Sequence, residues 1–274
     1  MSTAKFRMLL ATLSVAYCLP LSSASAAVFS DDFTGGVDPA WTTDRYEPAG
    51  FASVPFLGDD RLEISISDAQ GSANRPVGQS SSFYNTQGRN AAVGSVANWS
   101  VSADVYVSSD MTSGANLRRT DLWARTGDIG TETGAAYPII GLRRFDPADP
   151  FNASASNISS VWRVWDADTA NGWVDLADSV AAGWNNLKMV GDSSSIEFYL
   201  NNSLVYTDST VNGAAPELTN VFLQAYNFDG GPSQNYVAYW DNVNVDAVPE
   251  PASLALLSLG SLGLIVVRRR RLSV

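Results

Sequence analysis

Residues 99–107 read Trp-Ser-Val-Ser-Ala-Asp-Val-Tyr-Val, with an apolar side chain at every second position. Successive side chains of a β-strand point to opposite faces of its sheet, so this alternation predicts a strand with one buried face. The same period occurs at 61–66 (Arg-Leu-Glu-Ile-Ser-Ile) and at 195–200 (Ser-Ile-Glu-Phe-Tyr-Leu). The 3.6-residue period of an amphipathic helix is missing from the body of the chain. The fold class is therefore predicted to be all-β.

Other segments repeat this pattern between clusters of Gly, Asn, Asp and Ser. Further strands are predicted at 120–126, 137–145, 160–166, 184–190, 204–206, 219–226 and 236–245. Asn201-Asn202-Ser203 predicts a tight hairpin, because Asn adopts positive φ at little cost. Many short antiparallel strands in one domain over residues 27–247 indicate two stacked sheets, a β-sandwich or jelly roll.

The C-terminal segment combines a polar motif, an apolar run and a basic cluster. In order they are Val248-Pro249-Glu250-Pro251 within the motif 248–253, the apolar run 254–267, and Arg268, Arg269, Arg270 and Arg271. Four guanidiniums do not readily cross a bilayer, so they are expected to stay on the cytoplasmic side. The run is shorter than the roughly 20 residues that a spanning helix needs. The two prolines before it and the snorkelling arginines after it still favour a transmembrane helix over 254–267.

Residues 248–271 resemble the PEP-CTERM sorting signal of Gram-negative bacteria that make exopolysaccharide. Motif, helix and basic stop occur in the same order at the end of the chain. The resemblance implies recognition by an exosortase, a membrane cysteine protease thought to cut near the Pro-Glu-Pro motif. The protein would be anchored by its C-terminal helix and then moved to the cell surface or extracellular matrix. The LPxTG motif of the Gram-positive counterpart is absent.

The N-terminus has the features of a secretory signal peptide over residues 1–26. Lys5 and Arg7 precede an apolar stretch from residue 8 to residue 21, and Ala24-Ser25-Ala26 provides a small-residue cleavage site. The chain's one cysteine, Cys18, lies inside this segment. The exported body therefore has no disulfide and depends on its core for stability.

Charge and composition exclude several function classes. The chain has 28 acidic and 17 basic residues. The body has 27 acidic residues, because Glu250 lies outside it, and 11 basic residues, because Lys5, Arg7 and the four terminal arginines lie outside it. Its net charge is therefore about −16. Nucleic acid is excluded as a partner, because phosphate binding requires a basic surface. The chain has no histidine, so His-based triads and His-ligated zinc are excluded as well.

The body also resembles the concanavalin A-like jelly roll of laminin-G-like modules and family 16 glycoside hydrolases. The matching stretches are the opening Phe29-Ser-Asp-Asp-Phe33, the late Trp184-Asn-Asn-Leu-Lys-Met189, and the closing Tyr239-Trp-Asp-Asn-Val-Asn-Val245. In such folds a structural calcium ion lies where the N-terminal segment meets the closing strand, which implies Asp32 (or Asp31) and Asp241 as ligands. The alternative is that Asp31-Asp32 blunts an edge strand and Asp241 caps a bulge.

The carboxylate pattern does not indicate catalysis. A retaining glycosidase needs two carboxyl groups about 5–5.5 Å apart, which family 16 places as Glu-x-Asp-x-Glu. That motif is absent, and the five glutamates of the body are scattered (Glu47, Glu63, Glu132, Glu197 and Glu217). Asp166 and Asp168 would share a face of a continuing strand, but Asn171-Gly172 indicates a turn, so a solvated strand end is favoured. The loop 166–172 also imitates a calcium loop only in part. We predict no catalytic residue.

A ligand-binding face is the better candidate. In strand phase Asp121, Trp123 and Arg125 point one way, and so do Arg163 and Trp165 on a later strand. Indole rings stack on the C–H faces of sugars, and guanidiniums donate to hydroxyls and carboxylates. The alternative is that these tryptophans belong to the core and that the arginines only snorkel beside them.

Three function classes follow from these patterns. The first is a non-enzymatic surface or matrix protein that associates with exopolysaccharide. The second is a divergent polysaccharide hydrolase or lyase, and the third is a purely structural surface module. The absence of a catalytic motif favours the first.

Overall fold

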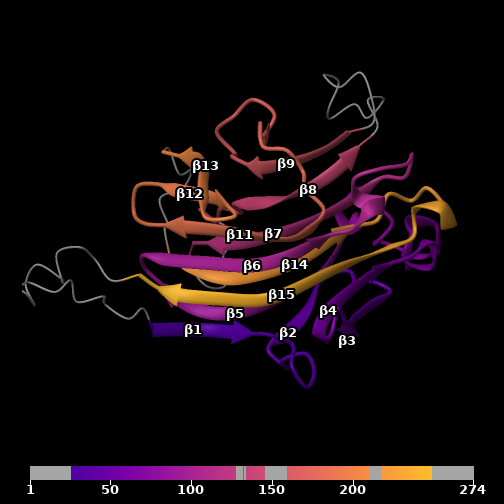
Figure 1. Cartoon of the computed structure of the whole chain (residues 1–274), viewed down its shortest axis with the longest axis horizontal. Helices are drawn as coiled ribbons and strands as arrows, with labels where there is room; N and C mark the ends of the chain where they lie inside the picture. Colours follow the sequence, from indigo (N-terminus) through magenta and orange to yellow (C-terminus); the bar gives the residue numbers. More distant parts are fainter. Residues whose placement is uncertain (1–25, 128–131, 133, 146–158, 210–216, 249–274) are drawn as a thin grey trace, which may run out of the picture.

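The computed structural model describes residues 26–127, 132, 134–145, 159–209 and 217–248, and Figure 1 shows two antiparallel β-sheets that lie face to face. Sheet A has the order β13-β12-β11-β6-β15-β4-β3, with β1 paired to β15, and sheet B has the order β10-β9-β8-β7-β14-β5-β2. In sheet A the bounds are β1 Ala26–Asp31, β3 Gly50–Phe56, β4 Asp59–Ile66, β6 Trp99–Val107, β11 Gly183–Gly191, β12 Ile196–Leu200, β13 Ser203–Asp208 and β15 Tyr236–Ala247. In sheet B they are β2 Trp41–Arg45, β5 Thr86–Val96, β7 Arg118–Thr126, β8 Ile139–Phe145, β9 Ser159–Trp165, β10 Trp173–Asp175 and β14 Leu218–Tyr226.

Strand β15 brings the two ends of the described chain together. Its first half pairs with β4, and its second half pairs with β1, with Asp31 opposite Val243. On its other side it pairs with β6, and the register shifts between Asp241 and Asn244. Asn242 has a φ of 50° at this bulge. In Figure 1 the indigo β1 accordingly runs along the yellow β15.

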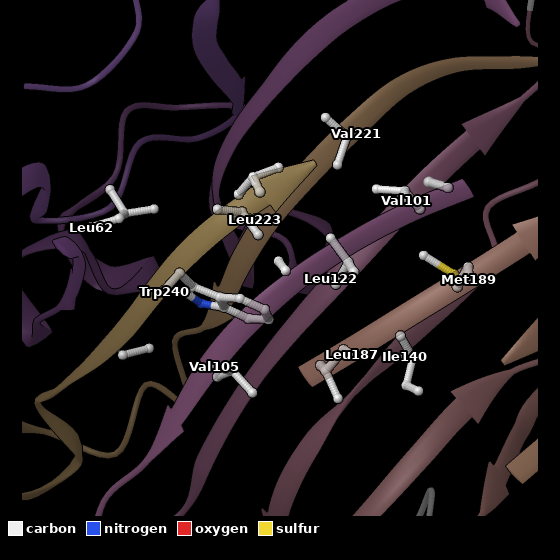
Figure 2. Close-up of a cluster of buried hydrophobic side chains, with 14 of the residues drawn as sticks. Leu62, Val101, Val105, Leu122, Ile140, Leu187, Met189, Val221, Leu223 and Trp240 are labelled. Carbon is white, nitrogen blue, oxygen red and sulfur yellow. The ribbon is translucent and has the colours of Figure 1, made fainter. Parts of the chain in front are cut away.

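The core lies between the two sheets and consists of their inward side chains. Figure 2 shows side chains from β4, β6, β11 and β15 of sheet A pointing toward side chains from β7, β8 and β14 of sheet B. Trp240 is fully buried, and its indole N–H donates to Thr120 Oγ1 of the opposite sheet at 2.9 Å. Each strand directs every second side chain into this core, because its side chains alternate between core and outer face.

The alternating pattern predicted ten strands, and all ten are present within about two residues of their predicted bounds. The predicted hairpin is also present, with positive φ at Asn201 and Asn202. Five strands were not predicted, namely β1, β2, β3, β5 and β10. Strand β5 contains Gly88 and several polar residues, so its sequence lacks the alternation, and β10 has only three residues. The helices of the described ranges are short 3-10 turns: Asp68–Gln70, Ser72–Asn74, Ser82–Asn85, Ser109–Met111 and Pro232–Gln234.

The predicted targeting segments lie outside the described residues. These are the signal peptide 1–26 apart from its last residue, the motif after Val248, the helix 254–267 and the arginines 268–271. Within the ranges that the structure does describe, no helix is long and apolar enough to cross a membrane.

Candidate functional site

A groove of about 1030 Å³ lies on the outer face of sheet B. Strands β2, β5, β14, β7, β8, β9 and β10 contribute side chains to it, together with Phe83 from the 3-10 turn before β5. Because the inward side chains of these strands fill the core, the alternate residues are left to line this groove. The groove is therefore lined by the side chains that point away from the core on each strand.

An aromatic row crosses the groove at right angles to the strands. Strand pairing aligns, in this order, Asn90, Phe222, Trp123, Ile139, Trp165 and Trp173. Trp165 and Trp173 pack edge to face, with ring centroids 5.1 Å apart. Phe222 also lies near Trp123 and Tyr137, at 6.2 Å in each case. From Phe222 to Trp173 the row is a continuous apolar floor that crosses five strands.

A polar row lies two residues further along each strand. It aligns Asp44, Gly88, Gln224, Asp121, Gly141, Arg163 and Asp175. A Cβ atom at Gly141 would lie 2.2 Å from Asp121 Oδ1, and one at Gly88 would lie 2.7 Å from Gln224 Oε1. The two glycines thus leave room for neighbouring polar side chains to lie flat in the sheet surface.

Arginines surround the aromatic row and stack on its rings. Arg45 lies 4.7 Å from the ring centroid of Trp123, and Arg119 lies 4.7 Å from that of Trp173. Arg163 is closer to Trp173, at 4.1 Å. The carboxylate partners are Asp44 for Arg45, Asp121 for Arg119, Glu132 for Arg125 and Asp175 for Arg163. Such contacts hold each guanidinium plane in place.

Burial changes the acidity of Arg163 and of Arg143, which lies opposite Arg119 on the neighbouring strand. It lowers the pKa of the Arg163 guanidinium to about 9 and that of Arg143 to about 10. Asp175 opposes the shift of Arg163, whereas the neighbouring positive charges of Arg119 and Arg143 add to it. Both groups stay protonated at pH 7, so buried positive charge lies beside the groove at neutral pH.

The structure places the five predicted ligand-binding residues on the same face of sheet B. Trp123, Arg125 and Trp165 line the groove, but only Trp165 is partly exposed, since Trp123 and Arg125 are 8% and 6% exposed. Asp121 and Arg163 lie in the polar row and are fully buried or nearly so; Arg163 is only 1% exposed and lies behind Trp173. A ligand therefore does not contact Asp121 or Arg163 directly. These two residues can affect binding only through the residues that they contact.

Several lining residues were missed by the sequence patterns, namely Asp44, Arg45, Arg119, Phe222 and Trp173. Phe222 lies on a predicted strand and Arg119 directly precedes the predicted strand 120–126, so extending the alternation of side chains could have identified both. Arg45 and Trp173 lie on strands that were not predicted.

The carboxylates of the polar row are far apart. Asp44, Asp121 and Asp175 are each separated by three strand spacings. At about 4.8 Å per spacing, neighbouring Cα atoms of this set are roughly 14 Å apart. A retaining pair requires about 5–5.5 Å, and an inverting pair about 6.5–9.5 Å. These three carboxylates therefore do not form a pair with glycosidase spacing.

The implied calcium ligands have other partners. Asp241 is buried at the β15 bulge, and its Oδ2 is 2.9 Å from Arg61 Nη1 and 3.0 Å from Asn242 Nδ2. Burial raises the pKa of the Asp241 carboxyl above its usual value, which Arg61 counteracts. Asp32 is exposed and accepts from the Thr34 amide. Since the guanidinium already supplies a positive charge to Asp241, this pair fits calcium poorly, and calcium binding there stays a prediction.

The neighbouring Asp31 has a structural role. Its carboxylate accepts hydrogen bonds from the Phe33 and Asp38 amides and from the Trp41 indole N–H, at 2.8, 3.1 and 2.9 Å. Asp31 therefore organises the loop between β1 and β2.

A second acidic cluster joins the turn after β9 to strand β13. Carboxylate oxygens of Asp166, Asp168 and Asp208 lie within 4.8 Å of one another. Asp166 accepts from the Asp168 amide and from the Tyr206 hydroxyl, which raises the pKa of Tyr206 to about 12. The turn that Asn171-Gly172 predicted is present, since the Asp166 amide donates to the Gly172 carbonyl. These oxygens are suitable cation ligands, although exposed acidic groups often bind none.

Comparison with known proteins identifies the sorting signal and the fold. A family model described as the PEP-CTERM protein-sorting motif matches residues 247–271. No curated protein matches the chain. A glycoside hydrolase family 16 endo-glucanase from Bacteroides ovatus is similar in structure, with a TM-score of 0.52 and 14% identity over 80% of this chain and 99% of that chain. A second family 16 structure from Bacteroides ovatus, of a mixed-linkage glucan system, has a TM-score of 0.52 and 13% identity, with the same coverage.

These findings confirm two predictions. The body is an all-β sandwich of the jelly-roll type, and the chain ends in a PEP-CTERM motif. The motif implies export and processing by an exosortase. At 13–14% identity the structural likeness shows the fold alone.

Proposed function

We propose that the protein is an exported, exosortase-sorted carbohydrate-binding protein of the cell surface or extracellular matrix, and that it associates with exopolysaccharide without cleaving it. The observation that carries the proposal is the aromatic row along the floor of the groove. From Phe222 to Trp173 the row crosses four strand spacings, roughly 19 Å, which suits a short stretch of a sugar chain. Trp165 and Trp173 are partly exposed and offer stacking surfaces, and the arginines and amides beside the row offer hydrogen bonds.

The wide spacing of the carboxylates supports a non-enzymatic role. Asp121, at the centre of the polar row, is fully buried and paired with Arg119 at 2.7 Å. A buried, paired carboxylate is a poor nucleophile or acid for a bound sugar. The likeness of the fold to family 16 hydrolases keeps a divergent hydrolase or lyase as the second candidate, and a purely structural module as the third.

Retention on the exopolysaccharide of the producing cells tests the proposal. We expect the wild-type protein to be retained in affinity electrophoresis and to release neither reducing nor unsaturated ends. Release of such ends would favour the enzyme. A protein that neither binds nor cleaves the polysaccharide would favour the third candidate, a purely structural module.

The sorting route can be tested independently of the ligand. Replacement of Arg268, Arg269, Arg270 and Arg271 by serine removes the charges expected to hold the C-terminus in the cytoplasm. We expect most of the variant to lose membrane retention and to escape exosortase processing, measured by cell fractionation and by the size of the product. As a control, a reporter fused after residue 240 should be active outside the cytoplasm; activity confined to the cytoplasm would contradict the assignment.

A further inference from the structure

We propose that the β2 end of the groove holds a second sugar subsite, formed by Phe83, Asp44 and Arg45. It binds an uncharged sugar unit of the same chain that stacks on Trp165 toward the other end. All four residues line the groove. This inference rests on the proposed carbohydrate-binding function and specifies its ligand class, an extended stretch of a sugar chain with a neutral unit at this position.

The first support is the backbone at the end of β2. Neighbouring residues of a regular strand point to opposite faces of the sheet, so Asp44 and Arg45 would not face the groove together. Arg45 has a φ of 42°, in the left-handed region that residues other than glycine rarely adopt. The alternation ends there, and both side chains line the groove. Backbone conformations of this kind persist where surrounding contacts hold them, and they are frequent at ligand-binding sites.

The second support is hydrogen-bonding capacity that a ligand can reach. Asp44 Oδ2 accepts from Arg45 Nε at 2.7 Å and from Gln224 Nε2 at 2.9 Å, and it is 2.6 Å from Arg45 Nη2. Asp44 Oδ1 and Arg45 Nη1 have no partner within the ranges that the structure describes. The two side chains are 18% and 15% exposed, and neither of these atoms is buried. A fixed acceptor therefore lies beside a fixed donor, which matches neighbouring hydroxyls of a sugar.

The third support is an exposed aromatic ring beside this pair. Phe83 is 60% exposed and lines the groove. The Arg45 guanidinium lies 5.3 Å from the ring centroid of Phe83 and 4.7 Å from that of Trp123, and these contacts fix its plane. An exposed ring next to a fixed acceptor and donor can bind one sugar unit through its C–H face and its hydroxyls.

The charge of this subsite favours an uncharged sugar. Asp44 and Arg45 compensate each other, so the pair adds no net charge to the groove. A ligand carboxylate near Arg45 would also lie near Asp44, and the attraction and repulsion would oppose each other. Hydroxyl groups both donate and accept, so they match the pair without this conflict.

The two subsites are far apart. Five strand spacings separate Asp44 on β2 from Trp165 on β9, roughly 24 Å at about 4.8 Å per spacing. A disaccharide is too short to contact both subsites, whereas a longer chain contacts both at once. Linked contacts strengthen binding, because the second one forms within a complex that already exists. The affinity for sugar chains should therefore rise with their length.

Fragments of the producing cells' exopolysaccharide, prepared by partial acid hydrolysis, provide the test, and isothermal titration calorimetry measures binding. Disaccharides are compared with long fragments, which exceed about 24 Å. We expect the wild-type protein to bind the long fragments about tenfold or more tightly than the disaccharides. Equal affinities would overturn the second subsite but leave the proposed function. Long fragments that fail to bind, while the intact polysaccharide is retained, would have the same meaning. If neither the fragments nor the intact polysaccharide bound, both would be overturned.

Two variants test the residues of the subsite. Phe83→Ala and Asp44→Ala should each lower the affinity for the long fragments about tenfold. The affinity for disaccharides should change far less, because these still bind at Trp165. The dependence on length should therefore largely disappear, which a general loss of stability would not produce. Thermal melts show whether each variant folds. Phe83→Ala removes a largely exposed ring, so it decides the question if Asp44→Ala does not fold.

Asp59→Ala is the matched control. Asp59 also pairs with an arginine that stacks on a tryptophan, since Arg61 is 3.0 Å from Asp59 and lies 5.5 Å from the ring centroid of Trp184, but this pair belongs to sheet A. The control variant should bind both kinds of fragment like the wild type. An unchanged affinity for long fragments in Phe83→Ala, or an equal loss in Asp59→Ala, would contradict the subsite.

Discussion

Replacing Trp165 by alanine should weaken retention on the exopolysaccharide about thirtyfold or more. Trp165 is partly exposed, lines the groove, and packs edge to face on Trp173. Binding energy concentrates in a few aromatic anchors, and removal of one typically costs about 2 kcal/mol or more. The fold should survive, because the ring lies on the outer face of sheet B. Affinity electrophoresis measures the binding loss, and a thermal melt measures stability.

Trp184 provides a matched control for this change. It is 36% exposed and lies on β11, on the outer face of the opposite sheet. Trp184→Ala removes the same atoms at a distance from the groove, so retention should not change. Equal losses of binding in the two variants would rule out a specific groove. Loss of binding together with loss of the melting transition in Trp165→Ala would assign Trp165 to the core.

Replacing Trp240 by alanine should lower the free energy of unfolding by about 3–5 kcal/mol. The indole is fully buried in the centre of the sandwich, and its N–H donates to Thr120 Oγ1. Figure 2 shows that core side chains of both sheets surround it. Removal leaves a cavity that rigid neighbouring strands can close only in part. The melting temperature should fall by roughly 2–4 °C for each kcal/mol, since the body has about 220 residues.

Trp184→Ala again serves as the control. Its ring contacts Phe56 and Tyr106 at the surface, so its removal should cost no more than about 1.5 kcal/mol. Urea unfolding of the two variants gives the comparison. Similar losses would mean that the core does not depend on Trp240. The body has no disulfide, so no cross-link hides such a change.

The sequence by itself determined features that local patterns encode. The period of two between 99 and 107, and at nine other segments, predicted strands that are all present. The order of motif, apolar run and arginines after Val248 predicted the sorting signal. Both features depend on residues close together in the chain. Alternation arises when one strand packs one of its faces against a core, and a sorting signal is recognised as a linear segment.

Tertiary structure alone decided which side chains meet in the groove. The alternation of side chains predicted that Trp123 and Trp165 point the same way on their strands. Only the pairing of β7, β8 and β9 aligned them in one row with Trp173. It also buried Arg163 behind Trp173, so that Arg119 and not Arg163 lines the groove. Register and strand order depend on contacts between residues far apart in sequence. A single sequence does not specify those contacts locally, because a strand of given alternation can pair with any neighbour that buries the same face.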